Sequence, residues 1–123
     1  MRRRPQSSFS ILVAIVVYFV VSGTFVSSAK DVPVVDAARN QDLQTVRALL
    51  KNGFDVNERQ ADGATALHWA VHWNDIGMVR ALIDSDGDVN AANVHGVTPL
   101  SLAAANASPD LVSMLVAAGA DPN

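Results

Sequence analysis

Two histidines near the middle of the chain have a spacing that suits metal binding. His68 and His72 lie four residues apart, so on a helix both side chains would project from one face. Asp75 follows three residues later and offers a carboxylate. The helical zinc-protease motif requires a glutamate directly after the first histidine, but Trp69 occupies that position. An incomplete two-histidine site is therefore one hypothesis, and a structural role for His68 is the other.

The run from Asp84 to Asp88 alternates carboxylates with small residues, as calcium loops do. An EF-hand loop requires glycine at its sixth position and glutamate at its twelfth, whereas here glycine is fourth and His95 is twelfth. We therefore expect a solvated turn at a helix end. The sequence also has no cysteine, nucleophile elbow or phosphate-binding glycine loop. These observations predict a protein that is not an enzyme and that holds no cofactor or metal.

Charge is distributed unevenly along the chain. The formal net charge is −3, but residues 1–29 contain three arginines and no acid. Residues 30–123 contain six basic and twelve acidic side chains. An acidic body repels phosphate backbones and anionic lipid surfaces. We therefore expect that the protein does not bind nucleic acid.

The first 29 residues have the layout of a secretory signal peptide. Arg2–Arg4 form a positive region, Ile11–Val21 is an unbroken apolar run, and small residues end at Ala29. We expect cleavage after Ala29. The alternative is an uncleaved anchor over residues 9–26, which is near the lower length limit for a membrane span and is the only membrane contact we expect. In both cases the rest of the chain is exported.

The rest of the chain repeats itself with a period of 33 residues and no gap. Five columns are identical in all three copies: Ala37/Ala70/Ala103, Val46/Val79/Val112, Leu49/Leu82/Leu115, Asp55/Asp88/Asp121 and Asn57/Asn90/Asn123. A fixed period of this length predicts a stacked array, in which each unit buries its apolar face against the next. We expect Leu49, Leu82 and Leu115 to form one buried column and Leu67 and Leu100 another.

Capping signals predict two helices in each unit. Thr65 and Thr98 are suitable N-caps, and Pro99 suits a first helical position, so short helices are expected at about 66–73 and 99–105. Asp42, Asp75 and Ser108 are the next N-caps. The second helices are then expected at about 43–51, 76–84 and 109–118. The stretches 55–63 and 88–96 predict turns or a hairpin that joins successive units.

These motifs resemble those of the ankyrin-repeat family. Residues 62–70 (DGATALHWA) and 95–103 (HGVTPLSLA) resemble the opening D-G-x-T-P-L-H-x-A of a repeat, and residues 119–123 (GADPN) resemble its closing G-A-D-x-N. The resemblance implies an all-α solenoid of helix–turn–helix units joined by hairpin-like loops, with repeats at about 30–59, 60–92 and 93–123. The first copy lacks the opening motif, as an N-terminal capping repeat would.

The family pattern also implies roles for individual residues. In ankyrin repeats the histidine of T-P-L-H bonds locally and ties neighbouring repeats together, which is the structural role open to His68. Ser101 replaces it in the third copy, where we expect a weaker tie. The motif positions implied to be structural are Gly63, Thr65, Leu67, His68, Ala70, Gly96, Thr98, Pro99, Leu100 and Ala103.

Ankyrin proteins bind other proteins through the loop tips and the concave face of the first helices. Carried onto this chain, the candidate partner-binding residues are Gln60, Asp62, His72, Trp73, Asn74, Asn93, His95, Ala105 and Asn106, with Ala61, Ala64, Val94 and Val97 beside them. Trp69 takes a position that is usually leucine, so we expect it in the core. Trp73 aligns with two asparagines, so we expect it to be exposed, either as a binding anchor or folded over a neighbouring loop.

The resemblance favours a non-catalytic protein-interaction module that is exported, most similar to ankyrin proteins of the bacterial periplasm. The last expected helix keeps an apolar stripe, whereas a terminal repeat normally turns a polar face to water. We therefore expect the array to continue beyond residue 123. An alternative is that these repeats are the N-terminal module of a longer exported enzyme or redox protein, with its active site beyond residue 123.

Overall fold

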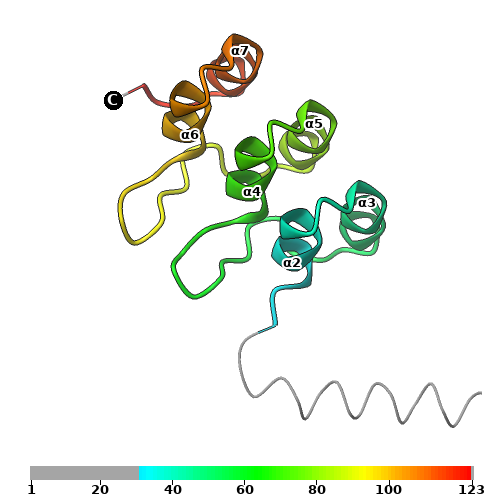
Figure 1. Cartoon of the computed structure of the whole chain (residues 1–123). Coiled ribbons are helices and arrows are strands. Elements are labelled where there is room, and N and C mark those ends of the chain that lie inside the picture. The colour runs from blue at the N-terminus through cyan, green and yellow to red at the C-terminus, as the bar shows by residue number, and fades with distance from the viewer. Residues whose placement is uncertain (1–30, 123) are drawn as a thin grey trace, which may run out of the picture. The chain divides into compact units, whose positions relative to one another are not determined.

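The structure, a computed structural model, describes residues 31–122, which contain six helices labelled as in Figure 1. Their bounds are α2 Pro33–Arg39, α3 Leu43–Lys51, α4 Ala66–His72, α5 Ile76–Asp84, α6 Pro99–Ala105 and α7 Pro109–Ala117. The predicted signal segment and its alternative as an anchor lie outside the described residues. Among the described helices, none has the length and apolar character needed to cross a membrane.

The helices form three consecutive antiparallel pairs, α2/α3, α4/α5 and α6/α7, which we call the first, second and third repeats. Helices α2, α4 and α6 stack in an inner row, and α3, α5 and α7 stack in an outer row (Figure 1). The loops before α4 and α6 project away from the inner row in the same direction (Figure 1). No strand forms within residues 31–122, so the predicted all-α solenoid is confirmed.

The loops resemble hairpins because hydrogen bonds close their bases. Gln60 N–H donates to Ala64 O at 2.9 Å, and Asn93 N–H donates to Val97 O at 3.0 Å one period later. A further bond of 2.8 Å from Val94 N–H to Asp62 O joins the two loops directly. The loops therefore stack on each other as the helices do.

The predicted helix starts are confirmed, and most of the caps form. The side chains of Asp42 and Asp75 accept hydrogen bonds from the N–H of Thr45 and Met78, each at the third helical position. Ser108 occupies the N-cap position but accepts no such bond, so α7 begins on the fixed backbone of its first-turn proline. Helices α4 and α7 each end one residue earlier than predicted.

Helix α2 begins with a cap that the sequence did not reveal. Its N-cap residue is Val32, whose side chain has no acceptor. The carboxylate of Glu58 takes over, because its Oε1 accepts hydrogen bonds from the N–H groups of Val34 and Val35. Burial raises the pKa of Glu58 despite these two bonds. A residue from the following loop thus secures the start of the array.

Burial follows the predicted leucine columns only in part. Leu67, Leu82 and Leu115 are at most 2% exposed, although Leu115 lies on α7, the last described helix of the outer row. Leu49, on α3, and Leu100, on α6, are only partly buried. The prediction of buried columns is therefore right for three of the five leucines and wrong for Leu49 and Leu100.

Asparagines of the closing motif link successive repeats. Asn57 Oδ1 accepts from Asp88 N–H at 2.7 Å, and its Nδ2 donates to Asp86 O at 3.3 Å. One period later Asn90 joins the last two connections in the same way, at 2.7 and 3.1 Å. The acidic cluster is thus a helix-end turn, as predicted, in which the Asp88 carboxylate caps its own turn by accepting from Asn90 N–H.

Candidate functional site

His68 is buried between the second and third repeats and uses both of its ring nitrogens. Nδ1 accepts from Thr65 N–H at 3.0 Å, so Nε2 carries the proton and donates it to Val97 O at 2.8 Å. The first bond closes the capping box of α4, and the second reaches across to the next loop. The residue is 4% exposed, and this burial lowers its pKa. The predicted structural role is confirmed.

The same geometry argues against a metal site at the two histidines. Both nitrogens of His68 are engaged in hydrogen bonds, so neither offers a free lone pair to a metal. His72 is exposed, unlike His68. Among residues 31–122, no group of three potential ligands could hold an ion. The geometry of His68 therefore favours the structural role over the two-histidine hypothesis, because its position three residues after Thr65 serves the cap of α4.

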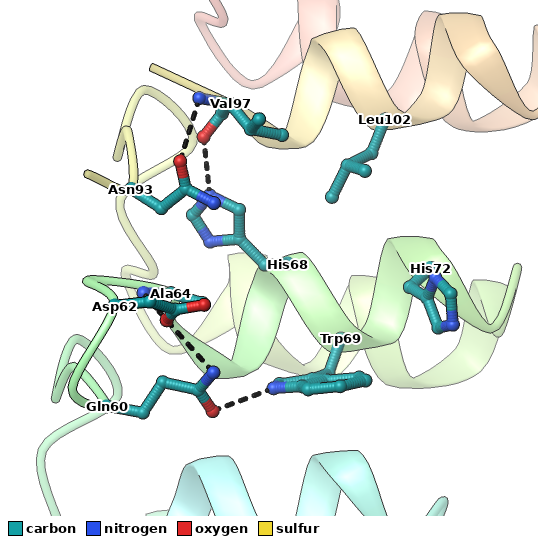
Figure 2. Close-up of a pocket in the computed structure, with 9 residues that line it drawn as sticks. All are labelled: Gln60, Asp62, Ala64, His68, Trp69, His72, Asn93, Val97 and Leu102. Carbon is teal, nitrogen blue, oxygen red and sulfur yellow. Dashed lines mark hydrogen bonds between the residues drawn. The ribbon is translucent and has the colours of Figure 1, made fainter. Parts of the chain in front are cut away.

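A cavity of about 290 Å³ opens between the second and third repeats (Figure 2). Four predicted partner-binding residues line it: Gln60, Asp62, His72 and Asn93. Ala64 and Val97 contribute from the two loops, as the family pattern implied. The other lining residues were not among the predicted partner-binding residues, namely His68 and Trp69 of α4 and Leu102 of α6. The loop tips and inner helices thus share one concave site.

Trp69 was expected in the core, but it lies at the boundary between the core and this cavity. It is partly buried and packs against the core cluster. Its indole also reaches the cavity, where Nε1 donates to Gln60 Oε1 at 3.0 Å (Figure 2). An indole is longer than the leucine usual at this position, so its polar end extends past the buried stripe of α4. The prediction of a core position is corrected accordingly.

Two hydrogen bonds fix the orientation of this indole. The amide of Gln60 accepts from Trp69 and donates through Nε2 to Asp62 Oδ1 at 2.9 Å. Asp62 Oδ1 also accepts from Ala64 N–H at 3.0 Å. The bond from Ala64, followed by the one from Gln60, lowers the pKa of Asp62. We call the series Asp62–Gln60–Trp69 the indole relay.

Three rings gather at the exposed end of α4. The Trp69 and His72 rings meet edge to face at 5.5 Å, and the Trp69 and Trp73 rings stack at 6.3 Å with 26° between their planes. Trp73 is 39% exposed, as predicted. Its Nε1 also donates to Arg39 O at 3.2 Å, in the preceding repeat. Trp73 therefore covers the preceding repeat, as the second alternative predicts, and keeps part of its ring in solvent. Its role as a binding anchor stays a prediction.

The remaining predicted partner-binding residues lie outside the cavity. Asn106 ties repeats together, because its Nδ2 donates to Val71 O at 3.0 Å. Asn106 thereby bonds the third repeat to the second, as Trp73, one period earlier, bonds the second repeat to the first. Asn74 has a left-handed backbone, with φ of 56°, in the turn after α4. His95 and Ala105 are exposed but do not line the cavity.

Comparison with known families agrees with this architecture. The family described as ankyrin repeats (3 copies) matches residues 34–123, a range that contains all six described helices except the first residue of α2. A comparison with curated proteins finds no match. The 33-residue period, the paired helices and the family match lead to one conclusion: the chain belongs to the ankyrin-repeat family.

Proposed function

We propose that the array binds another protein through its loop tips and inner helices, and that it does so outside the cytoplasm without catalysing a reaction. Ankyrin repeats are in general protein-interaction modules. The observation that carries the proposal is the cavity between the second and third repeats, where loop and helix residues converge beside a fixed indole. Tryptophan is enriched among residues that dominate binding energy.

Exposed apolar side chains extend this surface beyond the cavity. Val94, at the tip of the second loop, is 69% exposed, and Trp73 is 39% exposed. An exposed aromatic and a loop-tip valine beside a concave site are features of a protein-binding surface. A partner segment that lies along the loops would contact both while one of its side chains enters the cavity.

A non-catalytic role is supported by how the titratable groups of the cavity are used. His68 is held in its neutral form by bonds at both nitrogens, and Asp62 holds the indole relay in place. Neither is paired with a nucleophile among the lining residues. These groups support the shape of the site, which suits binding.

Export is proposed from the leader sequence alone. Three arginines, an apolar run and small residues ending at Ala29 favour secretion, with a bacterial periplasm as the expected compartment. Intact mass of the protein recovered from its own cells tests cleavage after Ala29. Recovery of the uncleaved chain in the cytoplasmic fraction would overturn the proposed export and leave partner binding untouched.

Partner binding is tested by photo-crosslinking in those cells. A photoreactive residue is placed at position 72, on the rim of the cavity, and in a matched control at position 47, which is exposed on α3 of the outer row. We expect a discrete protein adduct from position 72 and none from position 47. Adducts from both positions alike, or from neither, would contradict the proposal.

A further inference from the structure

We propose that the cavity between the second and third repeats accepts one basic side chain of the partner, with arginine preferred over lysine. The inference rests on the proposed protein-binding function and specifies the chemistry that this site selects. Four observations support it: the size of the cavity, its walls, its carboxylate and the charge around it.

The size of the cavity suits a single side chain. Its volume of about 290 Å³ is at the lower end of the range of roughly 300–1,000 Å³ typical of small-molecule sites. It is also open to solvent at the surface where the loops meet the inner helices (Figure 2). A cofactor would be poorly enclosed there, whereas a side chain from a bound segment needs only to enter from outside.

The walls combine apolar surface with an aromatic face. In Figure 2, Trp69 of α4 and Leu102 of α6 lie on opposite sides of the site, with His68 between their helices. Val97 adds apolar surface from the loop. The methylene groups of an arginine or lysine would pack against such walls, as long charged side chains do on apolar surfaces. The indole would attract the cationic group at the end of the chain.

Asp62 supplies the negative charge that makes an apolar occupant unfavourable. Its Oδ1 accepts two hydrogen bonds, while Oδ2 accepts none within residues 31–122. The bonds to Oδ1 lower the pKa of Asp62, so the carboxylate is ionised at neutral pH. A leucine or phenylalanine in the cavity would remove water from this charge without replacing it. A cation would pair with it.

Arg59, which precedes Gln60 in the chain, does not fill this role. Arg59 is held by two carbonyl oxygens, those of Gly63 and Ala92, each at 3.0 Å, and it does not line the cavity. Residues 31–122 carry twelve acidic and five basic side chains, so the array as a whole attracts a cationic partner. Because Arg59 is close enough to act electrostatically on His68, the preference for a cation rests on the Asp62 carboxylate at the cavity and on the overall charge of the array.

The indole relay explains the preference for arginine. The Gln60 amide is bonded to both the Asp62 carboxylate and the Trp69 indole, so these two groups are held on either side of it. A guanidinium is planar, stacks on aromatic rings and donates from several nitrogens at once, whereas an ammonium is a compact and more strongly hydrated charge. Arginine can therefore contact Trp69 and Asp62 together from one position.

The test is an NMR titration of the full chain with small peptides of known charge. The probes are acetyl-Gly-Arg-Gly-amide and its lysine, citrulline and norleucine counterparts. The chain has two tryptophans, and only the indole N–H of Trp69 lies at the cavity. We expect the arginine peptide to shift the Trp69 signal saturably, with an affinity on the order of millimolar for one side chain, and to leave Trp73 nearly unchanged.

Variants and controls separate charge from fold. Asp62→Asn keeps an oxygen that can accept from Ala64, but removes the charge, and we expect it to weaken binding of the arginine peptide by about fivefold or more. Asp84→Asn makes the same charge change at an exposed position on α5, and should change the affinity less than twofold. Trp69→Leu restores the residue usual in the family and should weaken binding comparably to Asp62→Asn.

Each outcome decides the inference. Tighter binding of the arginine peptide than of all three counterparts, lost in Asp62→Asn but not in Asp84→Asn, supports it. Equal binding of the lysine, norleucine or citrulline peptide, or no shift with any peptide, overturns it. The photo-crosslinking result depends on no particular side-chain chemistry in the partner. An adduct at position 72 combined with a negative titration would therefore reject this inference alone.

Discussion

The second and third repeats share the same opening motif but use its seventh residue, His68 or Ser101, differently. In the second repeat, His68 closes the capping box of α4 and also donates to Val97 O in the next loop. In the third repeat, Ser101 closes the box of α6 and its hydroxyl donates back to Thr98 O. An imidazole has two nitrogens on opposite sides of a ring, so it can serve its own helix and its neighbour together. A serine hydroxyl is too short to do both.

Equivalent residues of the opening motif are also more deeply buried in the second repeat than in the third. Thr65 and Leu67 of the second repeat are 2% exposed, whereas their counterparts Thr98 and Leu100 are only partly buried. The second repeat has a described neighbour on each side, and the third has one. The motif therefore sets the local helix start in both places, while a following repeat covers Thr65 and Leu67 and no described repeat covers Thr98 and Leu100.

The largest expected difference between the repeats concerns their equivalent leucines. Leu67→Ala should lower the free energy of unfolding by about 2–5 kcal/mol, because it leaves a cavity between two repeats. Leu100→Ala removes a partly exposed side chain and should cost about 1–2 kcal/mol. Urea unfolding of the two variants measures both values. Equal losses would show that the face of the third repeat is covered in solution as fully as that of the second.

The next prediction concerns the hydrogen bond from His68 to Val97 O, which joins the second and third repeats. His68→Ser places the third repeat's residue in the second, so the local cap can still form but the bond to Val97 is lost. We expect a loss of about 1–3 kcal/mol, because the buried ring and its bond to Val97 O are lost, although this carbonyl keeps its bond from Asn93 N–H. Ser101→Ala removes only the bonds of the hydroxyl with the N–H and O of Thr98 and should cost about 1 kcal/mol. If His68→Ser costs no more than Ser101→Ala in denaturant unfolding, the inter-repeat bond contributes nothing measurable.

The sequence predicted nearly all of the fold, because its signals are local and occur more than once. Thr65, Thr98, Asp42 and Asp75 each mark a helix start through a side chain that caps the first turn, and such signals located the five helices α3 to α7 to within a residue. Left-handed turns were predictable at glycines such as Gly53. They were not predictable at the non-glycine positions Gln41, Asn74 and Ala107, although these also recur with the 33-residue period.

The candidate site was only partly predictable. The loop positions of the cavity follow from the family pattern, but the reach of an individual side chain does not. Glu58 caps a helix 23–24 residues earlier, and Trp73 reaches a carbonyl 34 residues earlier. Trp69 was assigned to the core from the usual residue at its position, although its size takes it to the surface. Such contacts depend on side-chain length and on how two repeats pack together. A comparison of equivalent positions in the repeats does not reveal either of these.

A smaller difference is expected at the equivalent loop glycines. Gly63 and Gly96 both have positive φ, of 86° and 77°, so alanine is disfavoured at each by roughly 1–2 kcal/mol. At Gly63 an added Cβ would also approach Asn93 Cα at 3.2 Å, whereas at Gly96 it would meet nothing within 4 Å. We expect Gly63→Ala to lower the thermal midpoint further than Gly96→Ala. The reverse order would mean that the two loops are not stacked as described.

The smallest effect is a pH dependence that only the second repeat should show. Burial lowers the pKa of His68 in the folded chain below its ordinary value of 6.5. As pH falls below about 6.5, the unfolded chain takes up a proton at this residue before the folded chain does. The stability from neutral His68 is therefore fully present above that pH and is lost as pH falls toward the folded-state pKa. Ser101 does not titrate, so the third repeat has no equivalent loss.

The measurement is the difference in thermal midpoint between the wild-type chain and His68→Ser, taken at pH 7.5 and again at pH 5. The contributions of the other titrating groups cancel in this difference. That difference should shrink on acidification. A constant difference would show that protonation of His68 is equally favourable in both states, and hence that burial does not control its charge.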